Sequence, residues 1–236
     1  MKILGLDSAT TGCSAAVWSD GEILARRFEE MERGQAERLN PMIGEVMEEC
    51  GLDFHDLDGI AVTVGPGAFT GLRIGLAVAR ALALAAPMPI IGITTFAALA
   101  RAVPDAERSG RLLVIAVNGK RRDVYVEMTD SRGRIVTEAT TFDPAAGPAA
   151  LPGDPLLIAG DGGPQLRAAF EGCGEVGEDA DARIRFSEAM GPPDAAHVAS
   201  AGGAVLAGGG RHPVVPPRPL YVRAPDARLP GKRDGR

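Results

Sequence analysis

The order of the predicted elements repeats once along the chain, and this repeat limits the folds open to it. Each half begins with three short apolar runs typical of strands, expected at residues 3–7, 14–18 and 23–28 and again at 112–118, 123–129 and 135–141. Another strand and further helices follow in both halves. Two copies of one element order predict a duplicated α/β fold with two subdomains.

The connections between these runs suit that division. Asp20-Gly21 lies between the second and third runs and is a strong hairpin signal. Towards the end of the chain glycine and proline dominate and arginine recurs, which is typical of a tail. We therefore expect a first subdomain at 1–104, a second and smaller one at 105–210, and a Pro- and Arg-rich tail at 211–236.

Two helices are predicted in the first half. In the segment 39–50, apolar residues recur at spacings of three and four, and glutamates occupy the other face. This helix either begins near Gln35 or is capped by Asn40. The second helix, at 72–86, follows a glycine-rich loop, and Thr70 is its candidate N-cap.

The second of these helices carries few charges. A stripe of small residues occupies every fourth position, at Gly71, Gly75, Ala79 and Ala83. The charges are Arg73 and Arg80, which are seven residues apart and project from nearly the same side. Such a helix is either buried within the chain or docked on a partner. The two arginines favour an interface, because arginine is enriched at protein interfaces.

Composition argues against several classes of protein. The net charge of −6 argues against strong unaided binding of nucleic acid, which depends on basic contacts with phosphate. The three cysteines include no closely spaced pair, and the three histidines have no partner at metal-ligand spacing, so we expect neither a disulfide framework nor a metal site. We also expect no signal peptide and no membrane span.

Two segments have residues that suit phosphate. Asp7 ends the first strand, and its carboxylate could hold a metal-bound water while the hydroxyls that follow meet phosphate oxygens. A hairpin whose turn amides are satisfied by Asp7 and Ser8 explains the segment equally well. Gly65-Pro66-Gly67 precedes a helix, whose N-terminus attracts anions, but no Gly-Lys-Ser/Thr follows. A tight crossover turn explains this loop slightly better.

Two blocks of the sequence resemble the TsaB family, formerly called YeaZ. Residues 3–10 are Ile-Leu-Gly-Leu-Asp-Ser-Ala-Thr, with Cys13-Ser14 after them. Residues 65–75 are Gly-Pro-Gly-Ala-Phe-Thr-Gly-Leu-Arg-Ile-Gly, a block shared by few other families. The similarity is strong to about residue 100, weakens through the second half and returns at 219–223.

The resemblance implies an actin-like ATPase fold of the sugar-kinase (ASKHA, ribonuclease H-like) type. It also implies a non-catalytic, cytoplasmic scaffold that pairs with the transferase TsaD, is joined by the ATPase TsaE and transiently by TsaC, and forms a homodimer when alone. The process served would be N6-threonylcarbamoylation of the adenosine beside the tRNA anticodon. The alternative is a stand-alone actin-like kinase or ATPase that acts on a small molecule.

The resemblance places partner contacts on the first two helices. Mapped onto this chain, the contact residues would be Leu39, Met42, Ile43, Val46, Met47, Leu72, Arg73, Gly75, Leu76, Ala79, Arg80 and Ala83. The transferase TsaD has a metal-binding His-x-x-x-His motif, and this sequence has no such motif. We therefore expect no catalytic residue and no bound metal.

A weak or vestigial site for ATP or ADP is the remaining hypothesis about a cofactor. Its residues would be Asp7, Ser8, Thr10, Thr11, Gly65, Gly67, Gly160 and Asp161, the last two on the adenosine side. Asn118 stands where the family commonly has an aspartate, so a carboxylate that could organise a metal–nucleotide in the second half is expected to be missing. We expect the chain to have no cofactor of its own.

Overall fold

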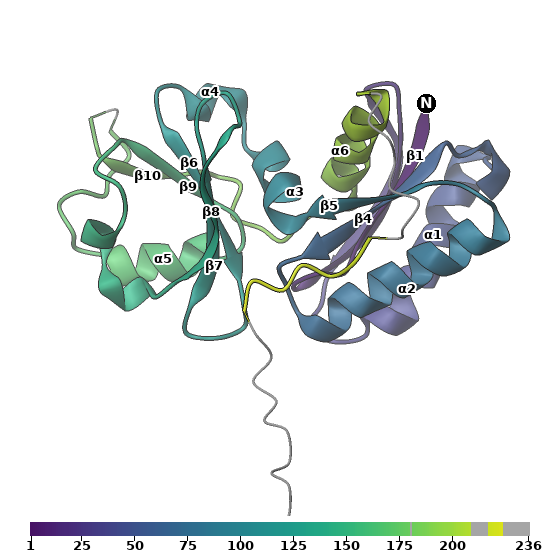
Figure 1. Cartoon of the computed structure of the whole chain (residues 1–236), viewed down its shortest axis with the longest axis horizontal. Helices are drawn as coiled ribbons and strands as arrows, with labels where there is room; N and C mark the ends of the chain where they lie inside the picture. Colours follow the sequence, from purple (N-terminus) through teal and green to yellow (C-terminus); the bar gives the residue numbers. More distant parts are fainter. Residues whose placement is uncertain (180, 209–216, 224–236) are drawn as a thin grey trace, which may run out of the picture.

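The computed structural model describes residues 1–179, 181–208 and 217–223, and it contains two mixed five-stranded sheets side by side (Figure 1). The strand order is β3-β2-β1-β4-β5 in the first sheet and β10-β9-β6-β7-β8 in the second. Read from its other edge, the second order is the first with every strand replaced by its counterpart. This confirms the predicted duplicated α/β fold of the actin-like type.

The elements of the first half are β1 (Lys2–Asp7), β2 (Gly12–Ser19), β3 (Glu22–Glu30), α1 (Gln35–Cys50), β4 (Gly59–Gly65), α2 (Phe69–Ala85), β5 (Ile90–Thr94) and α3 (Thr95–Ala102). β1 is antiparallel to β2 and parallel to β4. The Asp20-Gly21 turn joins β2 to β3, as the hairpin signal predicted. A short 3₁₀ helix at Phe54–Asp56 precedes β4.

The second half repeats this pairing. Its elements are α4 (Asp105–Arg108), β6 (Leu112–Asn118), β7 (Val124–Thr129), β8 (Ile135–Phe142), β9 (Leu156–Ala159), α5 (Gly163–Phe170) and β10 (Ile184–Phe186), with two 3₁₀ turns at Pro144–Ala146 and Pro148–Ala150. β6 is antiparallel to β7 and parallel to β9, as β1 is to β2 and β4. None of the helices in the described part of the chain is both long and apolar enough to cross a membrane.

The ends of the first two helices differ in part from the sequence prediction. α1 begins at Gln35, so Asn40 lies inside the helix and does not cap it. It ends where Gly51 adopts a left-handed conformation with φ 62° and its N–H bonds to the carbonyls of Met47 and Glu48. α2 begins one residue before the predicted cap, so Thr70 is helical and the N-cap position belongs to Ala68.

The last helix, α6 (Ala195–Ala207), packs on the first sheet, on the face opposite to α1 and α2 (Figure 1). The sequence division at residue 104 placed this segment in the second subdomain, and in this respect the structure differs. The physical reason is close packing that its glycines permit. A Cβ on Gly202 would lie 2.5 Å from the Cβ of Ala61, and one on Gly203 would lie 2.4 Å from the Trp18 ring. The helix therefore covers apolar strand residues that would otherwise face water.

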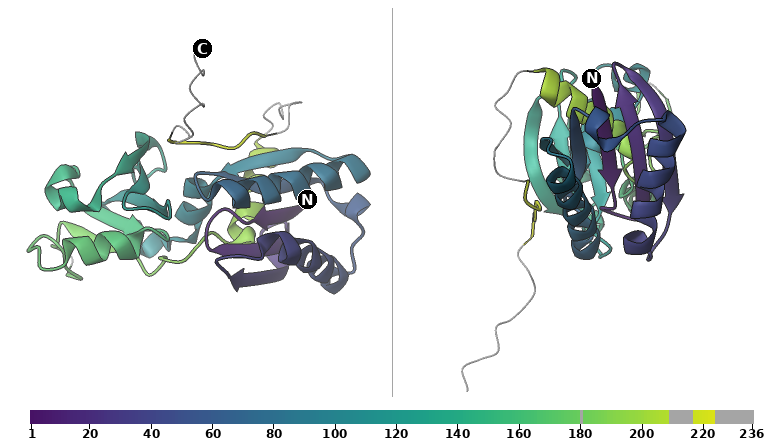
Figure 2. Two further views of the ribbon diagram at one scale, coloured as in Figure 1. Left: turned by 90° about the horizontal axis from the view of Figure 1, so that it is seen from below. Right: turned by 90° about the vertical axis from the view of Figure 1, so that its right-hand side faces the viewer.

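A described part of the predicted tail, residues 217–223, returns to the first half and lies beside α2 in both views of Figure 2. We call this segment the C-terminal strap. Its Leu220 N–H donates to the Val64 carbonyl at 2.7 Å, and the Leu220 side chain joins the core of the first half. At its far end, Arg223 pairs with Asp123 of the second half at 3.2 Å. The strap thus contacts both halves.

Most of the residues predicted for a partner surface are buried inside the chain, which corrects that placement. The buried ones are Leu39, Met42, Ile43, Val46, Met47, Leu72, Gly75, Leu76 and Ala79. Ala83 is partly buried against the same core, and only Arg73 and Arg80 are exposed. Helical periodicity marks an apolar face without showing what covers it, and here the first sheet and the strap cover it.

The small-residue stripe of α2 faces the chain itself. A Cβ on Gly71 would lie 2.0 Å from the Ser8 carbonyl oxygen, and one on Gly75 would lie 3.0 Å from Ser8 Oγ. Ser8 Oγ donates to the Gly71 carbonyl at 2.9 Å. The stripe therefore lets α2 approach the loop after β1, so the small-residue side of the helix is buried within the chain.

Two glycine-to-alanine changes in helices should have opposite effects on stability. Gly71→Ala should destabilise the chain by about 2 kcal/mol or more, because the new methyl group overlaps a backbone oxygen that cannot rotate away. Gly44→Ala in α1 is the matched control, since nothing lies within 4 Å of its Cβ position, and it should stabilise by about 0.5–1 kcal/mol. Urea unfolding of both variants checks this, and equal effects would contradict the packing described for α2.

Candidate functional site

Two carboxylates, one buried and one partly buried, lie where the two halves meet. Asp7 ends β1 and is fully buried, with its Oδ1 accepting from Thr63 Oγ1 at 2.6 Å and from the Ala9 N–H at 3.3 Å. Asp161 follows β9, and its Oδ1 accepts from the Asn118 N–H at 3.0 Å. Each carboxylate lies beyond the carboxyl end of a strand that runs parallel to a neighbour in its sheet, the edge where open α/β sheets place their ligands.

Burial changes the acidity of both groups. Loss of water raises the pKa of Asp7 to about 7, against the lowering effect of its bond from Thr63 and with a smaller contribution from the nearby charge of Asp161. Burial also raises the pKa of Asp161 to about 6, against the lowering effect of the bond from Asn118. At neutral pH this pair of acids therefore holds a proton that exposed aspartates would release.

Asp7 Oδ2 has no hydrogen-bond partner among the described residues. Asp161 Oδ2 and Thr10 Oγ1 make no hydrogen bond of good geometry there, although the Thr10 hydroxyl is close enough to Asp161 to lower its pKa. A buried polar atom without a partner costs about 1–3 kcal/mol, so this arrangement favours whatever can donate to it, such as a proton or a water molecule.

The loop predicted to hold phosphate is instead used by the chain itself. The Ala68 N–H donates to the Ala9 carbonyl at 2.6 Å, and a Cβ on Gly67 would lie 2.3 Å from that same oxygen. A Cβ on Gly65 would lie 2.7 Å from the Leu220 carbonyl of the strap. The turn after β4 therefore packs tightly on its neighbours, as the crossover-turn alternative predicted.

The remaining residues of the hypothetical nucleotide site have similar internal roles. Ser8 is buried and bonded to Gly71, and the Thr11 carbonyl accepts the Met31 N–H at 2.7 Å. Gly160 has φ +94°, and a Cβ there would lie 2.4 Å from the Ala116 carbonyl oxygen. The Ser8 hydroxyl and the backbone at Gly160 thus already contact the protein itself, and the nucleotide site stays a prediction.

Sequence reasoning named Asp161 but did not pair it with Asp7. Because Asn118 stands where the family commonly has an aspartate, it expected a metal-organising carboxylate of the second half to be missing, and it assigned Asp161 to the adenosine side. In the structure Asn118 supplies its backbone N–H, and the carboxylate comes from the next parallel strand. The signal that could have revealed it is the buried run at 156–159 followed by Gly160-Asp161, a strand end like that of β1.

No group of three or more His, Cys, Asp and Glu side chains that could hold a metal occurs in the described ranges. A hollow of about 410 Å³ lies nearby, at the starts of α1 and α2, and Lys120 of the second half reaches it. Glu32 and Glu37 line it as well, so its charge is mixed and it does not define a site for an anion.

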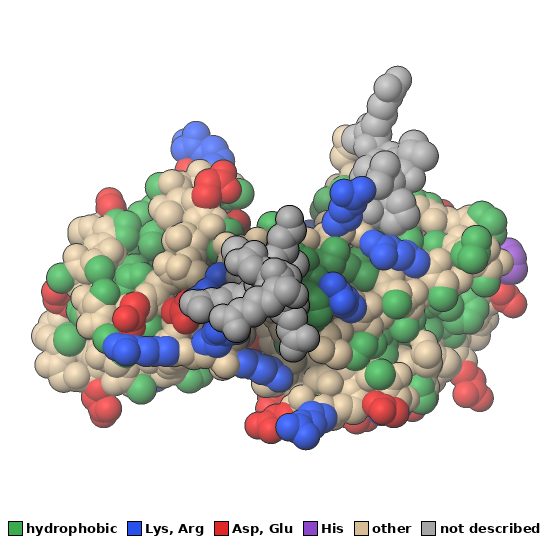
Figure 3. Space-filling model, turned by 60° about the horizontal axis from the view of Figure 1, so that its bottom comes forward, with side chains coloured by type: hydrophobic (Ala, Val, Ile, Leu, Met, Phe, Trp, Pro, Cys, Tyr) green, Lys and Arg blue, Asp and Glu red, His purple; other side chains and the backbone are tan. Residues whose placement is uncertain are grey.

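The outward side of α2 is the second notable feature of the surface. Phe69 is 51% exposed and Leu84 is 85% exposed, which is unusual for large apolar side chains. Arg73 lies over the Phe69 ring at 3.7 Å from its centre, and Arg80 donates to the Pro217 carbonyl of the strap at 2.8 Å. Figure 3 shows hydrophobic side chains spread over the half that holds α2, with Lys and Arg side chains gathered towards the middle.

The protonated state of Asp7 makes a testable contribution to stability. The pKa of this carboxyl rises from 3.8 to about 7 on folding, so the folded chain keeps a proton that the unfolded chain releases between those values. The resulting stabilisation is complete below a pH of about 4 and is lost as the pH rises through about 7. Asp7→Asn, which resembles the protonated acid, should therefore flatten this decline and be the more stable chain at alkaline pH, by at most about 4 kcal/mol.

Urea unfolding at pH 5 and pH 8 measures this difference. The control is Asp20→Asn, because Asp20 is exposed and its pKa is lowered by its bond with the chain's N-terminal ammonium group. That variant should gain no stability at the higher pH. Parallel pH profiles for the wild type and Asp7→Asn would contradict the assignment of a retained proton to Asp7.

A family model agrees with this architecture. The model described as TsaD, tRNA N6-adenosine threonylcarbamoyltransferase, matches residues 23–205, which is more than three quarters of the chain. The tRNA threonylcarbamoyladenosine biosynthesis protein TsaB of Escherichia coli (strain K12) is 37% identical over 125 residues, which cover 53% of this chain and 53% of that protein. The match thus spans about half the length of this curated relative.

Two other proteins are similar over almost their whole length. An uncharacterized protein of Mycobacterium tuberculosis (strain ATCC 25618 / H37Rv) is 30% identical over 230 residues, which cover 96% of this chain and 93% of that one. The solved structure of YeaZ from Pseudomonas aeruginosa has a TM-score of 0.73 and 26% identity, covering 93% of this chain and 99% of its own. From the extent of these matches, the chain belongs to the family described as TsaD, tRNA N6-adenosine threonylcarbamoyltransferase, and its resemblance to the TsaB (YeaZ) proteins is confirmed.

Proposed function

We propose that this chain is a cytoplasmic, non-catalytic subunit that supports the synthesis of threonylcarbamoyladenosine in tRNA by docking on the transferase TsaD. The single observation that carries the proposal is the outward side of α2, a 17-residue helix that exposes large apolar side chains and has only two charges. Large apolar side chains exposed on one side of a helix mark candidate interaction sites in soluble proteins.

The contact surface differs from the one proposed from sequence. On α2, Ala77, Ala81 and Leu84 are exposed at spacings of four and three, so they share one outward stripe. On α1, Asn40 and Gly44 are exposed four residues apart, and nothing lies within 4 Å of the Gly44 Cβ position. The two helices contact each other, so their outward sides form one surface on which another helix pair can pack closely.

The interior of the chain supports a role without chemistry of its own. Asp7 and Ser8 are buried, and the glycine-rich loop is bonded to the protein. A substrate at these groups would have to displace internal hydrogen bonds. The net charge of −6 also favours a division of labour in which the partner supplies most of the contacts with tRNA. We further propose that TsaE joins the resulting pair, that TsaC contacts it transiently, and that the chain forms a homodimer through the same surface when TsaD is absent.

The experiment that tests this function is threonylcarbamoyladenosine formation on tRNA with purified TsaC, TsaD and TsaE, with and without this chain. Modification should require the chain, and Asp7→Ala should leave the rate near that of the wild type. If modification proceeds equally well without the chain, the assignment is wrong. A chain whose Asp7→Ala variant loses activity while remaining folded and bound to TsaD would favour the kinase or ATPase alternative.

The placement of the docking surface has its own test. Leu84→Asp should weaken binding to TsaD by about tenfold or more, because it puts a charge into an apolar contact. Val205→Asp is the control, since Val205 is also an exposed apolar residue near the end of a helix, but on the opposite face of the first sheet. Titration calorimetry with TsaD compares the two. Equal affinities would move the docking surface away from α2.

A further inference from the structure

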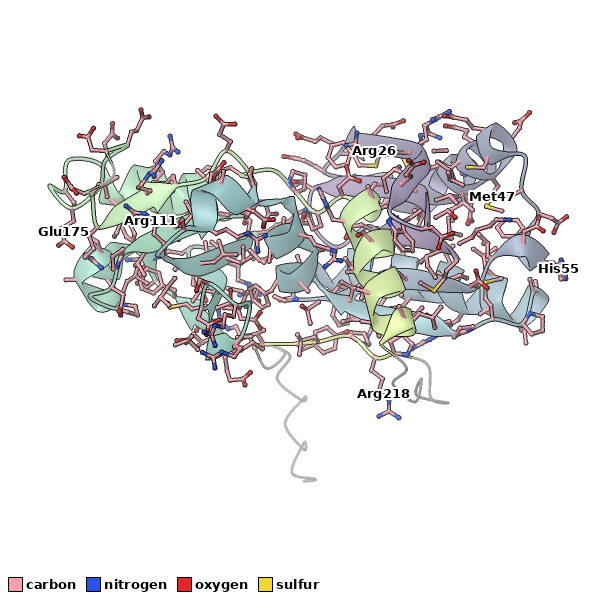
Figure 4. All side chains as sticks on the ribbon, turned by 90° about the horizontal axis from the view of Figure 1, so that it is seen from above. Arg26, Met47, His55, Arg111, Glu175 and Arg218 are labelled. Carbon is pink, nitrogen blue, oxygen red and sulfur yellow. The ribbon has the colours of Figure 1, made fainter. Side chains whose placement is uncertain are left out.

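The C-terminal strap lies in a fixed position on α2. Its backbone is bonded to Val64, and the Pro217 ring packs where a Cβ on Gly92 would stand, at 2.8 Å. The Tyr221 ring stacks on Phe69 with 5.7 Å between the ring centres and 27° between the planes. In Figure 4 Arg218 projects away from the body of the protein, so the strap also presents side chains outward.

The strap and α2 together form a groove that neither element has alone. The hollow measures about 420 Å³ and is lined by Arg73, Leu76, Arg80, Pro219 and Tyr221. The three α2 residues recur at spacings of three and four and share one side of the helix. Leu76 and Pro219 give the groove an apolar lining, and the Arg73 guanidinium lies over Phe69 while that of Arg80 bonds to the strap.

These two arginines are held in place without being neutralised. Arg73 stacks on Phe69, and Arg80 donates to a strap carbonyl, but neither has a carboxylate partner within the residues that the structure describes. Several other arginines of this acidic chain do pair with carboxylates, among them Arg26, Arg38 and Arg183. Two ordered, unneutralised arginines beside an apolar lining suit an Asp or Glu side chain. Its carboxylate would pair with the guanidinium groups, and its methylene carbons would contact the apolar residues.

We infer that this groove binds a carboxylate side chain of the transferase partner, so that the strap is part of the docking surface. The inference rests on the proposed function and goes beyond it in naming the strap and the chemistry of the bound group. Arginine and tyrosine in a partly enclosed pocket are the residue types that dominate interface energetics. A phosphate of tRNA would satisfy the same two cations, but it would gain nothing from the apolar lining, and the acidic chain as a whole would repel the rest of the nucleic acid.

The test compares single variants of the full-length chain in binding to purified TsaD by titration calorimetry. Arg73→Glu and Arg80→Glu should each weaken binding by about tenfold or more, with a weaker dependence of affinity on salt than in the wild type. Tyr221→Ala should weaken binding by about threefold to tenfold, because it removes the strap's wall of the groove and leaves both arginines in place. Circular dichroism and unfolding midpoints verify that the variants are folded.

Arg167→Glu is the matched control. Arg167 is an exposed helical arginine that lies over an aromatic ring, Phe186, at 4.8 Å, as Arg73 lies over Phe69, but it belongs to α5 of the second half. Its charge reversal changes the net charge of the chain by the same amount. Binding of this variant to TsaD should equal that of the wild type.

The possible results separate the inference from the function on which it rests. If the wild type binds TsaD and all the groove variants bind equally well, the groove inference is overturned and the docking function stands. A failure of the wild type to bind removes both. If the arginine variants weaken binding but Tyr221→Ala does not, the strap is not part of the surface and the inference fails. Losses confined to tRNA binding, measured by fluorescence anisotropy, or to self-association, measured by sedimentation, would also overturn it.

Discussion

The close approach of α2 to the loop after β1 is the contact on which the rest of the surface depends. Gly71 has no side chain, so the Ser8 carbonyl can occupy the space of a Cβ, and Ser8 Oγ bonds back to the Gly71 carbonyl. The neighbouring Ala68 N–H bonds to Ala9 in the same way. These contacts fix the start of a long helix on the body of the protein, and a rigid helix presents its outward side in one orientation.

The same contacts occupy polar groups at the start of α2. The Ala68 N–H and the Ser8 hydroxyl both hold the chain's own backbone. Asp7 and Asp161 remain near the boundary of the halves, and burial raises the pKa of each carboxyl, to about 7 and about 6. Protonation of such groups avoids the cost of burying their charge.

The strap connects the two halves of the molecule. It is anchored in the core of the first half through Leu220, seated on α2 through Tyr221, and paired with the second half through Arg223. The strap, at residues 217–223, thereby forms one surface together with α2, although the two segments are far apart in the sequence. Such composite surfaces are specific because neither contributing segment carries the full pattern of charge and shape.

The sequence by itself determined the duplicated element order, the two helices of the first half and the family, because period, turn residues and the 65–75 block are local properties of the chain. It also determined that Arg73 and Arg80 share one side of a helix. Tertiary structure alone decided which side of each helix is covered, that α6 crosses to the first sheet, and that Asp161 supplies the second carboxylate. Periodicity shows where apolar residues lie along a helix. Burial and the pairing of charges depend on contacts with elements distant in sequence, and a local sequence pattern does not specify those contacts.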